Sequence, residues 1–79
     1  MSDTLDRVKS ITADLLKVDE SRIKPESRFV EDLGARSIQS VELVASFEEA
    51  FDIDIDEQAA FKIKTVGGAA QFIDTVLGE

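Results

Sequence analysis

Residues 31–44 of this chain read Glu31-Asp32-Leu33-Gly34-Ala35-Arg36-Ser37-Ile38-Gln39-Ser40-Val41-Glu42-Leu43-Val44. Gly34 favours a turn, and the apolar spacing after it predicts an amphipathic helix that begins at about Ser37. A helix N-terminus presents unpaired N–H groups and the positive end of the helix dipole, so it suits a phosphate group. Ser37 Oγ is therefore well placed to carry a phosphodiester.

Length and composition narrow the class of protein. The chain has 79 residues, which predicts one domain over residues 1–79. It contains no cysteine and no histidine, so disulfides, thiolate metal sites and Ser-His or Cys-His nucleophiles are excluded within it. No apolar run is long enough to cross a bilayer and no signal-peptide pattern is present, so we expect a cytoplasmic protein that does not insert into membranes.

The acidic charge is concentrated in one part of the chain. The formal net charge is −8, and the segment between Ser37 and Phe61 carries acidic residues but no lysine or arginine. This pattern argues against a nucleic-acid partner, which needs a basic footprint. It favours protein partners with basic docking surfaces, because complementary charges steer association. The alternative is a solvated acidic face that only keeps the protein in solution.

One acidic cluster resembles the start of an EF-hand calcium loop, because Asp52, Asp54 and Asp56 alternate along the chain. However, Glu57 occupies the glycine position of that motif and Ile63 the position of its bidentate glutamate. We therefore predict no specific metal site, and only weak divalent binding by clustered carboxylates.

Apolar periodicity predicts an all-α chain. The expected helices are one that Asp3 caps and that stops near Lys17, one over about Ser37–Phe51, a short one over Glu57–Lys62 capped by Asp56, and a last one capped by Thr65. The long connection between the first two contains apolar residues at irregular spacing, which predicts a loop anchored to the core: Ile23, Phe29, Val30 and Leu33.

Four segments, in order, resemble acyl carrier proteins: Phe29–Gly34, Val41–Val44, Phe47–Asp52 and Ile63–Gly67. The resemblance covers nearly the whole chain and implies a four-helix acyl-carrier-type bundle with a long first loop and a short third helix. It implies that Ser37 bears a covalent 4'-phosphopantetheine arm, which carries acyl groups as thioesters in fatty acid, lipid or polyketide-type biosynthesis. The thiol belongs to the cofactor, so the protein is expected to be a carrier and not an enzyme.

The chain departs from this family just before the serine, where Arg36 replaces the usual aspartate, and just after it, where Gln39 replaces a common acidic residue. In the family these acidic positions help to dock the phosphopantetheinyl transferase and other basic partners. Arg36 is either an exposed side chain without effect, a partner of the phosphodiester, or a residue that narrows the range of partners. The predicted docking residues are Arg36, Ile38, Val41, Glu42, Glu48 and Phe61.

The resemblance also implies a place for the acyl chain between the helices. The predicted lining consists of Phe29, Leu43, Val44, Phe47, Ile55, Ala60 and Ile63, each of which is equally explained as ordinary core. Phe61 stands where the family tends to have a charged residue, and it either points outward toward a partner or folds back over the core or Lys62. We expect a monomer. The alternative functions are a poorly modified or unmodified interaction module and an aminoacyl or peptidyl carrier.

Overall fold

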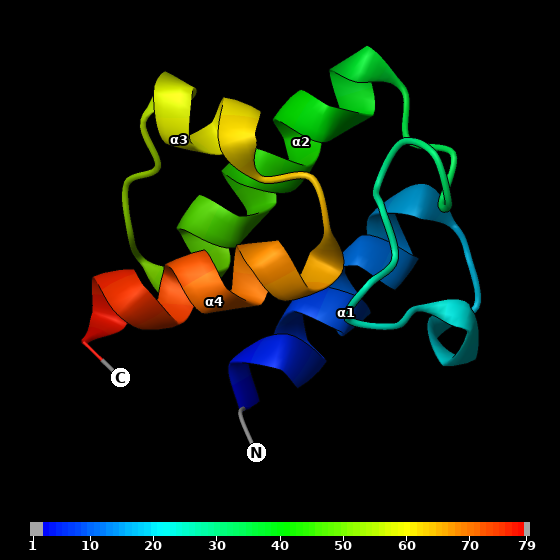
Figure 1. The fold of residues 1–79 in the computed structure, drawn as a ribbon, viewed down its shortest axis with the longest axis horizontal. Helices are drawn as coiled ribbons and strands as arrows, with labels where there is room; N and C mark the ends of the chain where they lie inside the picture. Colours follow the sequence, from blue (N-terminus) through cyan, green and yellow to red (C-terminus); the bar gives the residue numbers. More distant parts are fainter. Residues whose placement is uncertain (1–2, 79) are drawn as a thin grey trace.

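The computed structural model describes residues 3–78 of the chain. These residues form an all-α bundle in which a short third helix connects longer ones (Figure 1). The elements are α1 (Asp3–Leu16), the short 3-10 helix η1 (Glu20–Arg22), α2 (Ser37–Phe51), α3 (Glu57–Lys62) and α4 (Val66–Leu77). The four-helix fold predicted from the sequence is confirmed.

The ends of α1 differ in detail from the prediction. The helix begins at Asp3, so the expectation that Asp3 is its cap is wrong, and the cap position lies outside the described residues. Asp3 and Asp6 both lie in the first turn, where a carboxylate interacts favourably with the helix dipole. The helix stops before Lys17, which adopts the left-handed conformation with a φ of 60°. The predicted stop is therefore confirmed, although the chain uses a non-glycine residue there.

The two C-terminal helices begin at the predicted caps. The Asp56 carboxylate accepts a hydrogen bond from the Ala59 N–H at 2.8 Å, and the Thr65 hydroxyl accepts one from the Gly68 N–H at 2.9 Å. Each bond satisfies a donor that the first helical turn leaves unpaired. Local sequence therefore determines where α3 and α4 start.

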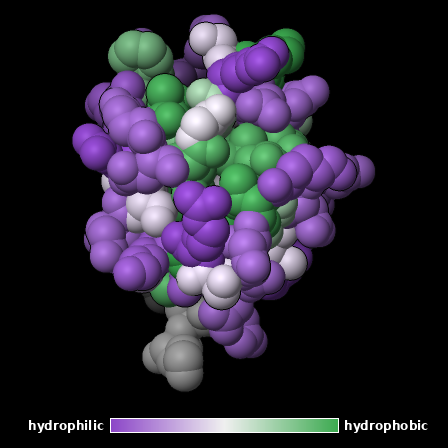
Figure 2. Space-filling model, turned by 90° about the vertical axis from the view of Figure 1, so that its right-hand side faces the viewer, coloured by the Kyte–Doolittle hydropathy of each residue, from purple (hydrophilic) through white to green (hydrophobic). Residues whose placement is uncertain are grey.

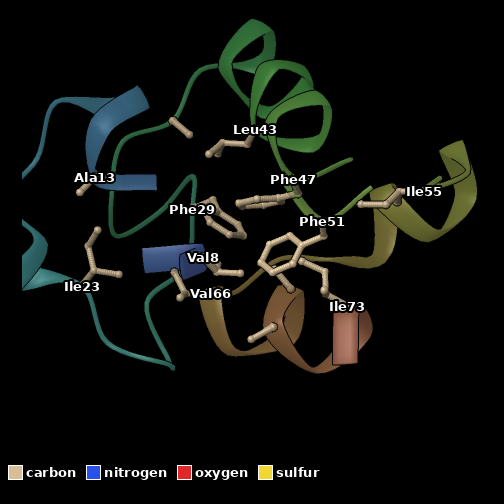
Figure 3. Packing of buried hydrophobic residues seen from close by; sticks show 13 residues of the cluster. Val8, Ala13, Ile23, Phe29, Leu43, Phe47, Phe51, Ile55, Val66 and Ile73 are labelled. Carbon is tan, nitrogen blue, oxygen red and sulfur yellow. The ribbon is translucent and has the colours of Figure 1, made fainter. Parts of the chain in front are cut away.

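The core lies between α1, α2 and α4, with contributions from the long loop (Figure 3). Helix α1 packs against both α2 and α4. The rings of Phe29 and Phe47 are tilted, with their centroids 6.3 Å apart. The buried hydrophobic residues are Val8, Ala13, Ile23, Phe29, Ala35, Leu43, Phe47, Phe51, Ile55, Val66, Ala69, Ala70 and Ile73. Burial of this apolar surface is the main stabilising term for the fold.

Polar contacts fix the register of α1 against its neighbours. The Thr4 hydroxyl donates a hydrogen bond to Asp74 Oδ1 in the last turn of α4. Arg7 Nη2 donates to the carbonyl of Ala50 at 2.6 Å, and the Arg7 guanidinium lies 4.2 Å from the centroid of the Phe51 ring. A cation at the C-terminal end of α2 also suits the negative end of its dipole.

The loop between α1 and α2 is anchored to the core by Ile23, Phe29 and Ala35, all of which are buried, whereas Leu33 is half-buried. Val30 is 55 % exposed, so its prediction as a core anchor is wrong. Arg28 forms an isolated antiparallel bridge with Thr65. Phe29 and Val30 belong to the turn that follows this bridge, in which Phe29 is buried in the core and Val30 faces outward.

Main-chain hydrogen bonds tie the same loop to the start of α4. The Phe29 N–H donates to Lys64 O, the Val66 N–H to Ser27 O, and the Gly67 N–H to Pro25 O at 2.7 Å. A Cβ atom on Gly67 would lie 2.8 Å from Pro25 O, so only glycine allows this close approach. The loop is thereby held in one place relative to the helices.

Figure 2 shows the side of the molecule on which this loop lies. Hydrophobic surface gathers in the middle of that face and is bordered by hydrophilic side chains. Within residues 3–78 no helix is sufficiently long and apolar to span a membrane.

Candidate functional site

Ser37 is positioned by a compact turn that precedes α2. The Gly34 N–H donates to Val30 O, and the Ala35 N–H donates to Phe29 O at 2.9 Å. Gly34 has a φ of 74°, as its predicted role in the turn requires. Ala35 is buried beneath the turn, whereas Arg36 and Ser37 are exposed. The turn therefore places Ser37 on the surface as the first residue of α2.

The first turn of α2 is open to an anion. Arg36 is the N-cap residue, and its N–H donates to Gln39 Oε1 at 2.9 Å. The Arg36 side chain makes no capping hydrogen bond, since a guanidinium has donors only, and the first turn contains no acidic residue. The leading N–H groups of α2 are therefore not capped by the residue that usually fills this role.

The nearby Asp32 is engaged elsewhere. Its Oδ2 accepts hydrogen bonds from the Arg28 N–H at 2.8 Å and from Arg28 Nε at 3.0 Å, and its Oδ1 accepts one from Arg28 Nη2 at 3.1 Å. These bonds with Arg28 lower the pKa of the Asp32 carboxyl below its ordinary value. The Arg28–Asp32 pair closes the turn from within, so Asp32 is not an ion-pair partner for Arg36.

Ser37 opens onto an apolar cleft between α2, α3 and the long loop. The cleft has a volume of about 490 Å³. It is lined by Phe29, Val30, Glu31, Ser37, Ser40, Leu43, Val44, Phe47, Ile55, Phe61, Ile63 and Lys64. All of the residues predicted to surround an acyl chain are brought together here except Ala60, which is half-buried but does not line the cleft.

Sequence reasoning missed some of the lining. Val30, Glu31, Ser40, Phe61 and Lys64 border the cleft but were not predicted to do so. Val30 follows the buried Phe29 in a turn, and Lys64 precedes the cap of α4, so neither carries a helical periodicity that points to a pocket. Ser40 lies one turn after Ser37, and this spacing is the one signal that places it on the same side of α2.

The residues predicted to dock partners lie in different surroundings. Ile38 and Val41 are each 65 % exposed, and Glu42, one turn after Ile38, is exposed beside them on α2. Arg36 is exposed at the helix start. Glu48 is half-buried, and its Oε2 accepts a hydrogen bond from the Ile55 N–H at 2.7 Å. The Glu48 carboxylate therefore supports the α2–α3 connection.

Phe61 points outward from α3 and is 77 % exposed. Its ring is covered on one side by Lys64, whose Nζ lies 4.7 Å from the ring centroid. The sequence left open whether Phe61 is exposed or folds back over the core or Lys62, and the structure shows exposure with Lys64 as the contacting cation. Because Phe61 also lines the cleft, the same side chain faces both solvent and the cavity mouth.

Comparison with known proteins agrees with this geometry. The family described as "Phosphopantetheine attachment site" matches residues 6–73. A curated protein of Phenylobacterium zucineum (strain HLK1), named "Acyl carrier protein", is 47 % identical over 78 residues, which cover 99 % of each chain. These matches define a non-catalytic carrier with covalently attached 4'-phosphopantetheine. The chain belongs to the acyl carrier protein family.

The residues present fit that cofactor. An exposed serine hydroxyl stands at a helix start without a capping side chain, and an apolar cleft opens beside it. When bound, the cofactor supplies the thiol that forms the thioester, which the cysteine-free chain itself lacks.

Proposed function

We propose that Ser37 is the attachment residue and that residues 1–79 act as one acyl carrier domain in fatty acid, lipid or polyketide-type biosynthesis. The observation that carries the proposal is the position of Ser37, exposed at the start of α2 and at the edge of the apolar cleft. The helix end interacts favourably with the phosphodiester, and the cleft lies within reach of a cargo on the arm.

Ser40 is the nearest competing hydroxyl, and its surroundings suit it less. It is half-buried one turn into α2, and its Oγ donates to the carbonyl of Arg36 at 3.3 Å. A nucleophilic hydroxyl must be accessible to the enzyme that modifies it, so the exposed Ser37 is the better substrate.

The chemistry of the cleft favours an apolar acyl group over an aminoacyl or peptidyl cargo. Its walls are formed largely by phenylalanine, leucine, isoleucine and valine side chains. An apolar chain gains free energy from burial against such walls, whereas a charged amino group loses hydration there.

The proposed partners are a phosphopantetheinyl transferase and acyl-transferring or acyl-modifying enzymes with basic docking surfaces. The exposed Ile38 and Val41 offer apolar contacts beside Glu42, and Phe61 offers another across the cleft. We further propose that the protein works as a monomer in the cytoplasm, since a net charge of −8 opposes self-association.

The test is loading by a broad-specificity phosphopantetheinyl transferase with coenzyme A, followed by intact mass. The wild type and Ser40→Ala should each gain one phosphopantetheine, whereas Ser37→Ala should gain none and keep its helical circular dichroism. Loading of Ser37→Ala would move the site elsewhere. An unmodified wild type under conditions that load a known carrier would favour an interaction module without an arm.

A further inference from the structure

The charge at the start of α2 is opposite to that of the chain as a whole. The net charge is −8, yet the residue directly before Ser37 is an arginine and the first turn of the helix has no acidic residue. The dipole adds partial positive charge at the same place. Arg36 and the helix dipole therefore place positive charge directly beside Ser37 on a strongly acidic protein, although Glu31 lines the same cleft.

The Arg36 guanidinium is not neutralised by the fold. Within residues 3–78 the ion pair present joins Arg28 to Asp32, and neither Asp32 nor Glu31, the other acidic residue of the turn before Arg36, forms an ion pair with Arg36. Arg36 is anchored through its backbone, whose N–H donates to Gln39 Oε1 and whose carbonyl accepts from the Ser40 N–H. The main chain of Arg36 is thus held while its side chain stays exposed and available.

We infer that the Arg36 guanidinium pairs with the phosphodiester on Ser37 and acts as a positioning residue for the root of the arm. This inference rests on the proposed attachment at Ser37. A guanidinium presents paired N–H donors that match two phosphate oxygens, and it stays charged at all relevant pH values. The neighbouring residue is therefore the cation best placed to hold the phosphate at the helix end.

Pairing at Arg36 has a consequence that a merely exposed arginine lacks. Attachment of the arm places the negative charge of the phosphodiester beside Arg36. If the two groups pair, attachment stabilises the folded protein more when Arg36 is present than when it is replaced. An arginine without effect, or one that only contacts partner enzymes, changes both forms equally. The change in melting temperature on loading therefore separates these roles.

The experiment compares loaded and unloaded forms of the wild type, Arg36→Ala, Arg36→Lys and Lys24→Ala, with loading verified by intact mass. Lys24→Ala is the control because it removes one exposed positive charge from the long loop. At low salt the change in melting temperature on loading should be about 2–6 °C less favourable in Arg36→Ala than in the wild type. Arg36→Lys should retain part of the effect, Lys24→Ala should match the wild type, and added salt should shrink the difference.

A second readout observes the phosphate itself. The ³¹P resonance of the loaded phosphodiester should shift between the wild type and Arg36→Ala, and should stay unchanged in Lys24→Ala. Equal changes in melting temperature on loading, with an unshifted resonance, would overturn the inference and leave the attachment site standing. Failure of Arg36→Ala to load, while Lys24→Ala loads, would assign Arg36 to transferase docking and would also overturn it. Absence of loading in the wild type would contradict the proposed function instead.

Discussion

At the scale of single residues, Glu48 illustrates how a surface pattern conceals a structural role. Sequence resemblance assigned it to partner docking together with Glu42. In the structure the Glu48 carboxylate accepts the Ile55 N–H at 2.7 Å and so holds the segment that leads into α3, while Glu42 is free on the surface. The backbone N–H of Ile55 is part-buried, so losing this acceptor leaves a donor without a partner.

Replacing Glu48 by alanine should therefore destabilise the unloaded protein by about 1–2 kcal/mol, as measured by urea unfolding. Glu48→Gln keeps a carbonyl acceptor and should lose less. Glu49→Ala, the exposed neighbour on the same helix, serves as the control and should change stability by less than about 0.5 kcal/mol. Equal losses in the Glu48→Ala and Glu49→Ala proteins would show that the hydrogen bond does not stabilise the connection.

Residues with strong local signals were the ones that sequence predicted well. Asp56 and Thr65 cap their helices, and Ser37 begins α2, because each signal depends only on neighbouring backbone. The ends of the first two long helices were predicted, but the left-handed conformation of Lys17 and Asp52 just after them was not, since neither residue is glycine. Val30 and Ala60 were misplaced because facing outward or into a cleft depends on segments far away in sequence.

At the scale of elements, α3 is the helix beside the cleft that packs least tightly against the core. It has six residues, none of which is fully buried, and its N-terminus is held by the Asp56 cap. A helix this short has little intrinsic stability and depends on its caps and neighbours.

Phe61, which lies on α3 and lines the cleft, is a suitable position for a fluorescent probe. The chain contains no tryptophan and no tyrosine, so Phe61→Trp introduces a single indole fluorophore at the cavity mouth. If acyl chains enter the cleft, loading a long acyl group should move the indole emission to shorter wavelength and reduce its quenching by iodide, because the ring gains apolar contacts. The phosphopantetheine-loaded protein without an acyl group is the reference. Identical spectra for both forms would show that the cargo does not reach Phe61.

At the scale of the whole molecule, two aspartates of the long loop link stability to acidity. Hydrogen bonds from Ser21 lower the pKa of Asp19, and hydrogen bonds from Arg28 lower the pKa of Asp32. A carboxyl whose pKa is lower in the folded state than in the unfolded state stabilises the fold at any pH above its unfolded-state pKa. It loses that contribution as the pH falls through its folded-state pKa. The ordinary pKa of both carboxyl groups is 3.8, so this stability should be lost below pH 3.8.

Thermal melts should therefore show a wild-type melting temperature that drops as pH falls below about 4. Asp32→Asn should melt lower near neutral pH and lose less over the acidic range, because the titrating group is gone. Asp14→Asn removes an exposed aspartate of α1 and should keep the full acidic drop. A drop of the same size in Asp32→Asn would mean that the Arg28–Asp32 pair does not link folding to pH.

The fold as a whole was more predictable than its cleft. Helix periodicity and caps act over a few residues, and the order of helices follows directly from them. The cleft is made from α2, α3 with its flanks, and the loop, which main-chain hydrogen bonds of Phe29, Val66 and Gly67 tie to the start of α4. Such long-range main-chain pairing leaves no periodic trace in the sequence.

The hydrogen bond between Thr4 and Asp74 brings the first turn of α1 beside the last turn of α4. In Figure 1 these two helix ends lie on the side of the bundle away from the start of α2. A tether at either helix end, whether a linker to a bead, to a surface or to a fused enzyme, would leave the hydroxyl of Ser37 facing free solution. The bundle thus has the two joined helix ends on one side and the exposed Ser37 on the other.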